Sequence, residues 1–258
     1  MLSSAFTWDN ANVLAVIARD AYLEPKEFKK KWKKAKFIEG DDTQCYVWPV
    51  PPPTGAGNSN QLVVVFRGTE PRSLEDIKTD LKFKKTASDG GGEVHYGFKD
   101  ALDDVWEKLH KTFKNNTLYF CGHSLGGALA TLAAGRVNTE KCQLYTFGSP
   151  KCVDQKWISQ QVYSSHAWRF RNNNDVVTKV PFMGYKHFGH IMYFDYRGDW
   201  KQHFSKWYLA GQWCIGNAIG LINLRWDSFG DHSIENYIDN ILKHCEKTKD
   251  EDLPEEVE

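Results

Sequence analysis

A serine between two glycines carries the most specific chemistry in the sequence. Residues 122–126 read Gly-His-Ser-Leu-Gly, the pattern G-x-S-x-G, with Ser124 at the centre. The apolar run 117–121 predicts a strand before it, and the small residues of 124–137 predict a helix after it. Such a tight turn forces the serine into an unfavourable backbone angle that only flanking glycines tolerate, so its hydroxyl projects at the carboxyl edge of a sheet. The amides of the helix N-terminus point at the same place, which suits a developing oxyanion and predicts a nucleophile.

A serine hydroxyl is a poor nucleophile at neutral pH, so a base and an orienting carboxylate are needed nearby. In this setting the expected chain order is serine, then acid, then histidine. His232 lies in a loop just before the last predicted helix, from which it can reach the sheet edge. Asp175 follows the predicted strand 166–171 in a polar loop and is the favoured acid. His166 and His244 are interpreted as structural. The residue types leave competing acids open, namely Asp154, Asp195, Asp199, Asp227 and Asp231.

The elements that must position these residues alternate between strand and helix. Further strands are predicted at 44–50, 61–66 and 142–148, and further helices at 9–23, 96–113, near Lys156 and at 232–244. The run Val63-Val64-Val65-Phe66 shows no polar alternation, which is typical of a strand buried on both faces. We therefore expect an α/β fold with a mostly parallel central sheet flanked by helices on both faces. One domain is predicted over 1–246, followed by an acidic, disordered tail over 247–258.

Composition excludes several classes of protein. The 258 residues include 33 basic and 33 acidic side chains, so the net charge is zero and nucleic acid is not an expected partner. None of the six cysteines forms a C-x-x-C pair, so no metal site or cofactor is predicted, and the cysteines are interpreted as reduced structural thiols. The N-terminus lacks the basic and apolar regions of a secretion signal. The expected location is the cytoplasm or the periphery of a membrane.

Two segments could contact lipid. An uncharged run of eighteen residues begins at Trp207 and ends at Leu224, but its Gln, Asn and Gly residues argue against a transmembrane span. It is expected to be a buried element or a surface that contacts lipid. A second run, from Lys26 to Lys36, contains seven lysines and is expected to be a solvated helix face. The alternative is a cationic patch for anionic lipid headgroups, assisted by Phe28, Trp32 and Phe37.

Short motifs spread over about residues 40–245 give a resemblance to a known family. The chain resembles the class 3 lipases, the fungal-type lipase family of the α/β-hydrolase fold. The motifs occur in the order of the family and are FRGT at 66–69, VHYGF at 94–98, GHSLGG at 122–127, FGSP at 147–150, NNNDVVTKVP at 172–181, YKHFG at 185–189 and DH at 231–232.

The resemblance implies a catalytic triad of Ser124, Asp175 and His232. It also implies an oxyanion hole formed by the backbone N–H groups of Thr69 and Leu125. The segment 70–78 would be a lid, and its mostly polar sequence predicts weak activation at an oil–water interface.

The expected reaction is hydrolysis of carboxylic esters of lipids, as in a triacylglycerol lipase, through an acyl-enzyme and without a metal or cofactor. A phospholipase, a galactolipase or an esterase for soluble esters is the alternative. A membrane-binding module without catalysis is the alternative from another class.

Overall fold

The computed structural model describes residues 1–52, 60–68, 84–181, 183–201 and 230–251. Its centre is an eight-stranded sheet of order β1-β2-β3-β6-β7-β8-β9-β10. Within this sheet, β3, β6, β7, β8 and β9 run parallel to one another, whereas β1, β2 and β10 pair antiparallel. The expected mostly parallel sheet is therefore present, with an antiparallel extension at each edge.

The strands have the following bounds: β1 (Lys36–Glu39), β2 (Gln44–Pro49), β3 (Gln61–Phe66), β6 (Thr117–His123), β7 (Cys142–Phe147), β8 (Ala167–Asn172), β9 (His190–Phe194) and β10 (Trp200–Lys201). A separate antiparallel pair is formed by β4 (Lys85–Ala87) and β5 (Glu93–His95). The helices are α1 (Trp8–Asp20), α2 (Pro25–Lys31), α4 (Tyr96–His110), α5 (Leu125–Val137), α6 (Gln155–Ile158) and α9 (Ile234–Glu251).

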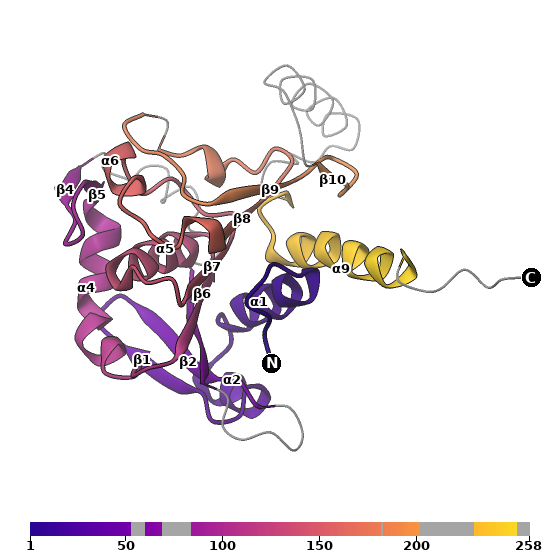
Figure 1. The fold of residues 1–258 in the computed structure, drawn as a ribbon, viewed down its shortest axis with the longest axis horizontal. Helices are drawn as coiled ribbons and strands as arrows, with labels where there is room; N and C mark the ends of the chain where they lie inside the picture. The colour runs from indigo at the N-terminus through magenta and orange to yellow at the C-terminus, as the bar shows by residue number, and fades with distance from the viewer. Residues whose placement is uncertain (53–59, 69–83, 182, 202–229, 252–258) are drawn as a thin grey trace, which may run out of the picture.

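Helices cover both faces of the sheet, with α1 and α9 on one face and α4 and α5 on the other (Figure 1). The side chains of β3 alternate between the two resulting cores. Val64 and Phe66 pack on the α4 and α5 side, while Val63 and Val65 pack on the α1 and α9 side. This two-sided burial is the physical reason for the unbroken valine run in the sequence.

The last helix is longer than the sequence suggested. It begins at Ile234 and continues past Lys247 to Glu251, into the segment that was expected to be a disordered tail. Its apolar side chains Tyr237, Ile238 and Ile241 pack into the α1 side of the core. Cys245 is the last residue that packs there, and the following six residues include two Lys and two Glu, which favour helix, so the helix extends beyond its packed part.

The lysine-rich run forms α2 and the turn that leads to β1. Its lysines are exposed, as expected for a solvated face. Two of its aromatic side chains contact the rest of the protein: Phe28 stacks on Tyr46 at 3.8 Å between ring centroids, and the Trp32 indole donates to Asp20 at 2.9 Å. Phe28 is fully buried and cannot contact lipid, whereas Trp32 and Phe37 are partly buried, so lipid contact through those two residues stays a prediction.

Two further expectations concern membranes and thiols. No helix in the described part of the chain is long and apolar enough to cross a membrane. The run from Trp207 to Leu224 lies outside the described residues. The described cysteines are buried, and burial raises the pKa of the Cys121 thiol well above its ordinary value. They act as small apolar residues of the core.

Candidate active site

Ser124 occupies a sharp corner between β6 and α5. Its backbone has φ 56° and ψ −128°, a strained conformation for a residue with a side chain. The neighbouring positions must be glycine because a side chain would not fit at either of them. A Cβ on Gly122 would lie 2.3 Å from the Gly126 carbonyl, and one on Gly126 would lie 2.3 Å from the Phe66 carbonyl oxygen. The tight turn that the sequence predicts is thus present, for the steric reason given.

The Ser124 hydroxyl makes no hydrogen bond within the described residues. Ser124 is the N-cap of α5, a position where serine usually accepts a hydrogen bond from the first turn, yet its side chain makes no such bond. The residue is 0% exposed, and Oγ has no hydrogen-bond partner among the described residues. A buried hydroxyl without a partner costs free energy, so an unpaired one at a strained corner points to function.

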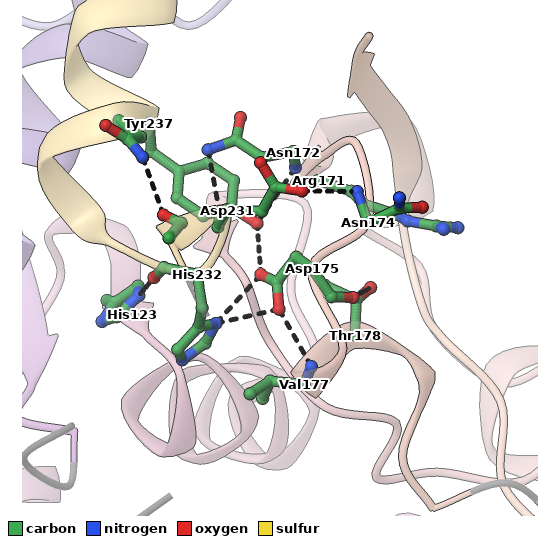
Figure 2. A network of polar contacts seen from close by, with 12 residues as sticks. His123, Arg171, Asn172, Asn174, Asp175, Val177, Thr178, Asp231, His232 and Tyr237 are labelled. Carbon is green, nitrogen blue, oxygen red and sulfur yellow. Dashed lines mark hydrogen bonds and ion pairs between the residues drawn. The ribbon is translucent and has the colours of Figure 1, made fainter. Parts of the chain in front are cut away.

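His232 and Asp175 form a buried pair. The His232 Nδ1 atom lies 3.0 Å from Oδ1 and 2.9 Å from Oδ2 of Asp175 (Figure 2). Both residues are buried. Because Nδ1 faces a carboxylate, it carries the proton in the neutral ring, and Nε2 is the free basic atom. Nε2 is also buried without a hydrogen-bond partner in the described part of the chain.

The ring of His232 lies beside the backbone of the serine corner. His123, which directly precedes the serine, has its ring centroid 4.6 Å from that of His232. On another side lies Gly148 with φ +60°, where a Cβ would come within 2.9 Å of His232 Nδ1 and 2.8 Å of Asp175 Oδ2. Gly148 directly follows Phe147, whose carbonyl accepts the Ser124 N–H at 3.0 Å. The structure therefore brings the serine, histidine and aspartate predicted from the sequence to one corner.

The Asp175 carboxylate has two further donors. The Tyr237 hydroxyl donates to Oδ2 at 2.6 Å, and the Val177 N–H donates to Oδ1 at 2.9 Å. Burial, together with the charge of Asp175, raises the pKa of Tyr237 well above its ordinary value, so the hydroxyl keeps its proton and donates. Tyr237 was not singled out in the sequence. It lies five residues after His232, but only the docking of α9 shows that it reaches the acid.

Asp231, one of the competing candidates for the acid, does not contact the His232 ring but connects two loops. Its Oδ2 accepts the Asn174 N–H at 2.9 Å and the Asn173 amide at 3.3 Å, while its carbonyl accepts from the Asn172 side chain (Figure 2). Asp231 thus ties the loop that carries the acid to the loop that carries the base. It positions both loops, while Asp175 contacts the ring.

His123 locks the backbone of His232. Its Nε2 lies 2.7 Å from the His232 carbonyl, which can only accept, so Nε2 is the donor. Its Nδ1 then accepts from the Tyr22 hydroxyl at 2.9 Å. Burial, and then the neighbouring His232 ring, lower the pKa of His123 well below its ordinary value. A neutral His123 therefore links the end of α1 to the loop of the candidate base.

The competing residues have other roles where the structure describes them. Asp154 caps α6 through the Trp157 N–H at 2.7 Å, Asp195 pairs with Lys201, and Asp199 pairs with Lys243. The His244 ring stacks on Trp8, and the His187 ring lies 2.7 Å from the Thr178 carbonyl. His166 ends a short 3₁₀ turn before β8. Asp227 lies outside the described residues.

The oxyanion hole is described only in part. Leu125 is the first residue of α5, where backbone N–H groups have no partner within the helix and can bind an anion. It borders a cavity of about 660 Å³ whose other walls include Phe98, Ala101 and Asp100. Thr69 and the expected lid 70–78 lie outside the described residues. Within the described ranges, no group of three or more His, Cys, Asp or Glu side chains could hold a metal ion.

Comparisons with known proteins relate the chain to lipases. The family described as Lipase (class 3) matches residues 63–185. The triacylglycerol lipase OBL1 of Arabidopsis thaliana is 26% identical over 255 residues, which cover 76% of this chain and 48% of that protein. A secreted mono- and diacylglycerol lipase of Penicillium cyclopium is 33% identical over 143 residues, which cover 50% of this chain and 46% of that protein. The chain spans less than half the length of these two relatives.

Solved structures show the same architecture. The triacylglyceride lipase of Rhizomucor miehei matches with a TM-score of 0.59 and 22% identity, covering 72% of this chain and 79% of that one. Lipase II of Rhizopus niveus matches with a TM-score of 0.55 and 23% identity, covering 72% and 80%. Together with the observed mainly parallel sheet, these similarities confirm the predicted α/β-hydrolase fold.

Proposed function

We propose that the chain is a member of the class 3 lipase family, whose model matches residues 63–185, and that it is a serine hydrolase that cleaves carboxylic esters of lipids. The observation that carries the proposal is a pair of complementary atoms at one corner. Ser124 Oγ and His232 Nε2 are both buried and both lack a hydrogen-bond partner among the described residues. One is an acid that must lose a proton to react, and the other is a base held in the correct tautomer by Asp175.

The proposed reaction has two steps. Ser124 Oγ attacks the ester carbonyl while His232 Nε2 takes its proton, and the imidazolium is stabilised by Asp175. The tetrahedral intermediate collapses to an acyl-enzyme as His232 returns the proton to the departing alcohol. Water, deprotonated by His232, then attacks the acyl carbon and releases the fatty acid and free Ser124.

The negative charge of each tetrahedral intermediate would be held by backbone N–H groups of Leu125 and Thr69. Leu125 is well placed for this, because it directly follows Ser124 and opens α5, where the backbone N–H groups have no partner within the helix. One such donor contributes about 3 kcal/mol to lowering the barrier.

The substrate class is supported by the relatives. Those cited above are named as lipases for triacylglycerols or for mono- and diacylglycerols. We therefore favour neutral acylglycerols over phospholipids, galactolipids and soluble esters. A panel of these four classes, assayed below and above the solubility limit of each ester, would rank them. A rise in rate at the solubility limit indicates a lipase, and saturation before it indicates an esterase.

Contact with a lipid surface is a further part of the proposal. The exposed lysines between Lys26 and Lys36 offer positive charge to anionic headgroups, whereas their neighbour Phe28 is buried inside the protein. The run from Trp207 to Leu224 is the second candidate. With these surfaces the catalytic unit, residues 1–246, would act either in the cytoplasm or at the periphery of a membrane.

Replacement of the nucleophile tests the function. We expect Ser124→Ala to lower kcat/KM on emulsified acylglycerols by at least about 10³-fold, because covalent catalysis is lost while binding remains. Ser159→Ala is the matched control, since Ser159 is an exposed serine that bonds only to the nearby Lys156 carbonyl. Unchanged turnover in Ser124→Ala would overturn the proposal. The alternative is a membrane-binding module without catalysis. In that case the wild-type protein would not react with a serine-directed fluorophosphonate, whereas the proposed hydrolase would.

A further inference from the structure

Strand β8 carries two arginines on one face. Arg169 and Arg171 are two residues apart, so their side chains leave the same side of the sheet. Trp168 and Phe170, which alternate with them, pack on the α1 and α9 side. The two guanidinium groups therefore lie on the opposite side, where α5 and the segment that follows β7 pack.

A lysine and a histidine join them there. The Lys151 ammonium donates to the Lys179 carbonyl at 3.0 Å, and its backbone N–H donates to the Val180 carbonyl at 2.8 Å. The His187 Nε2 donates to the adjacent Thr178 carbonyl at 2.7 Å. These contacts place Lys151 and His187 against the same short 3₁₀ segment, which directly follows the loop of Asp175.

The charges in this cluster act on one another. Burial, and then Arg171, lower the pKa of Arg169 to about 10. Burial lowers the pKa of Lys151, and both arginines lower it further. Burial, and then Arg169, lower the pKa of His187 to about 3. The directions of these pKa shifts agree with the placement of the two arginines on one face of β8 and of Lys151 and His187 against the segment that follows it.

The two arginines make few contacts in the part of the chain that the structure describes. Neither arginine forms an ion pair there with a carboxylate, and the Nε atoms of Arg169 and Arg171 are buried without a hydrogen-bond partner. The contacts of Arg171 are a 3.4 Å hydrogen bond to the Asn173 carbonyl and the ring of Tyr193 at 5.5 Å. Partly buried cations without a partner are costly, and an anion that bound among them would relieve the cost.

The donor types select the class of anion. Guanidinium groups present parallel N–H donors that match tetrahedral phosphate oxygens, and a lysine adds a point charge. The side chains of Lys151, Arg169 and Arg171 are partly exposed, so a ligand can reach them from solvent. We propose that Lys151, Arg169 and Arg171 form a binding site for a phosphate-type oxyanion, carried either by a soluble phosphate or by a lipid headgroup.

Inorganic phosphate is the probe for the site itself. At constant ionic strength, set with sodium chloride, phosphate should raise the Tm of the wild-type protein by about 5 °C at a hundred times its Kd. Titration calorimetry should show saturable binding at one site. Arg169→Gln and Lys151→Gln should each reduce the Tm shift to below about 1 °C. Lys151→Gln keeps a donor for the Lys179 carbonyl, so it remains informative if Arg169→Gln does not fold.

Arg197→Gln is the matched control, because it removes one exposed positive charge outside the cluster. It should keep the full phosphate effect. The proposal is overturned if phosphate gives no more stabilisation than chloride, or if both cluster variants keep the wild-type response.

Vesicles distinguish the two sources of the phosphate group. Co-sedimentation is compared on phosphatidylcholine vesicles with and without phosphatidic acid, for the wild type and for Lys151→Gln. Phosphatidic-acid binding that Lys151→Gln weakens assigns the site to a headgroup. A phosphate effect in solution without such a difference assigns it to a soluble phosphate. These binding measurements do not depend on hydrolysis. A negative result would therefore contradict the phosphate site without contradicting the proposed hydrolase activity.

Discussion

Two charged side chains of strand β8 and the loop after it differ in whether the protein itself supplies a partner. The Asp175 carboxylate, just after the strand, is fully buried and receives hydrogen bonds from His232, Tyr237 and the Val177 N–H. The Arg169 guanidinium, within the strand, is partly buried and has no carboxylate partner among the described residues. A charge that the chain pairs itself is held in one geometry, whereas a charge left unpaired is available to a ligand.

The difference is also one of chemistry. Donors on three sides hold the Asp175 carboxylate in place and fix the ring that it contacts, which suits a group that must not move during a reaction. The cations of the cluster repel one another, so they lower stability until an anion arrives. Three substitutions test this contrast.

The largest effect is expected at the paired charge. Asp175→Asn keeps the shape of the side chain but removes its charge and its preference for a protonated Nδ1. We expect kcat/KM on a soluble ester to fall by about 10⁴-fold, with little change in secondary structure by circular dichroism. Asp199→Asn is the control, because Asp199 pairs with Lys243 on the surface. Equal activity in both variants would show that Asp175 is not the acid of the triad.

A smaller effect is expected from one of the donors to that charge. Tyr237→Phe removes the 2.6 Å hydrogen bond to Asp175 but keeps the packing of the ring. A hydrogen bond to a charged group contributes about 1.5 to 3 kcal/mol, so kcat should fall by about tenfold or more. KM should stay unchanged, because the tyrosine acts through Asp175 and does not touch substrate. A change confined to KM would mean that Tyr237 shapes the substrate pocket instead.

The smallest effect is expected at the unpaired cluster and concerns stability. His187 has a pKa lowered to about 3 in the folded protein, by burial and by the facing cations Arg169, Lys151 and Arg171. Between about pH 6.5 and pH 3 the unfolded chain therefore binds a proton that the folded chain does not. Stability rises with pH across this window and is lost on acidification, by up to about 1.4 kcal/mol per pH unit for this group.

His187→Gln should flatten that dependence, because glutamine keeps a donor for the Thr178 carbonyl without titrating. Urea unfolding at pH 5 and pH 7 gives the two stabilities. His110→Gln, at an exposed histidine, should leave the difference as in the wild type. If His187→Gln shows the wild-type difference as well, the cluster does not suppress the charge of His187.

The serine corner could be predicted because its requirement is local. A G-x-S-x-G run between a strand and a small-residue helix determines the backbone angle at Ser124 and the need for glycine at 122 and 126. The unbroken valine run likewise indicates two-sided burial. Asp175 and His232 needed the additional resemblance to a family, because several other carboxylates and histidines follow suitable elements.

The remaining features depend on contacts between distant segments. Tyr237 meets Asp175 only when α9 docks, and Tyr22 meets His123 only when the end of α1 reaches β6. In the lysine-rich run, the sequence did not show which side the aromatic residues face. A strand pattern also does not reveal that Arg169 lacks a counter-ion, because partners far along the chain decide that.

The pairing of α1 with α9 has a consequence for protein synthesis. These helices stand near opposite ends of the chain, lie side by side on one face of the sheet (Figure 1), and are joined by an Arg19–Glu235 ion pair of 3.4 Å. His232 stands just before α9 and is fastened through His123 to Tyr22, after α1. A nascent chain still emerging from the ribosome therefore carries the nucleophile without its base. The serine corner can therefore gain its base only after α9 has left the ribosome and docked beside α1.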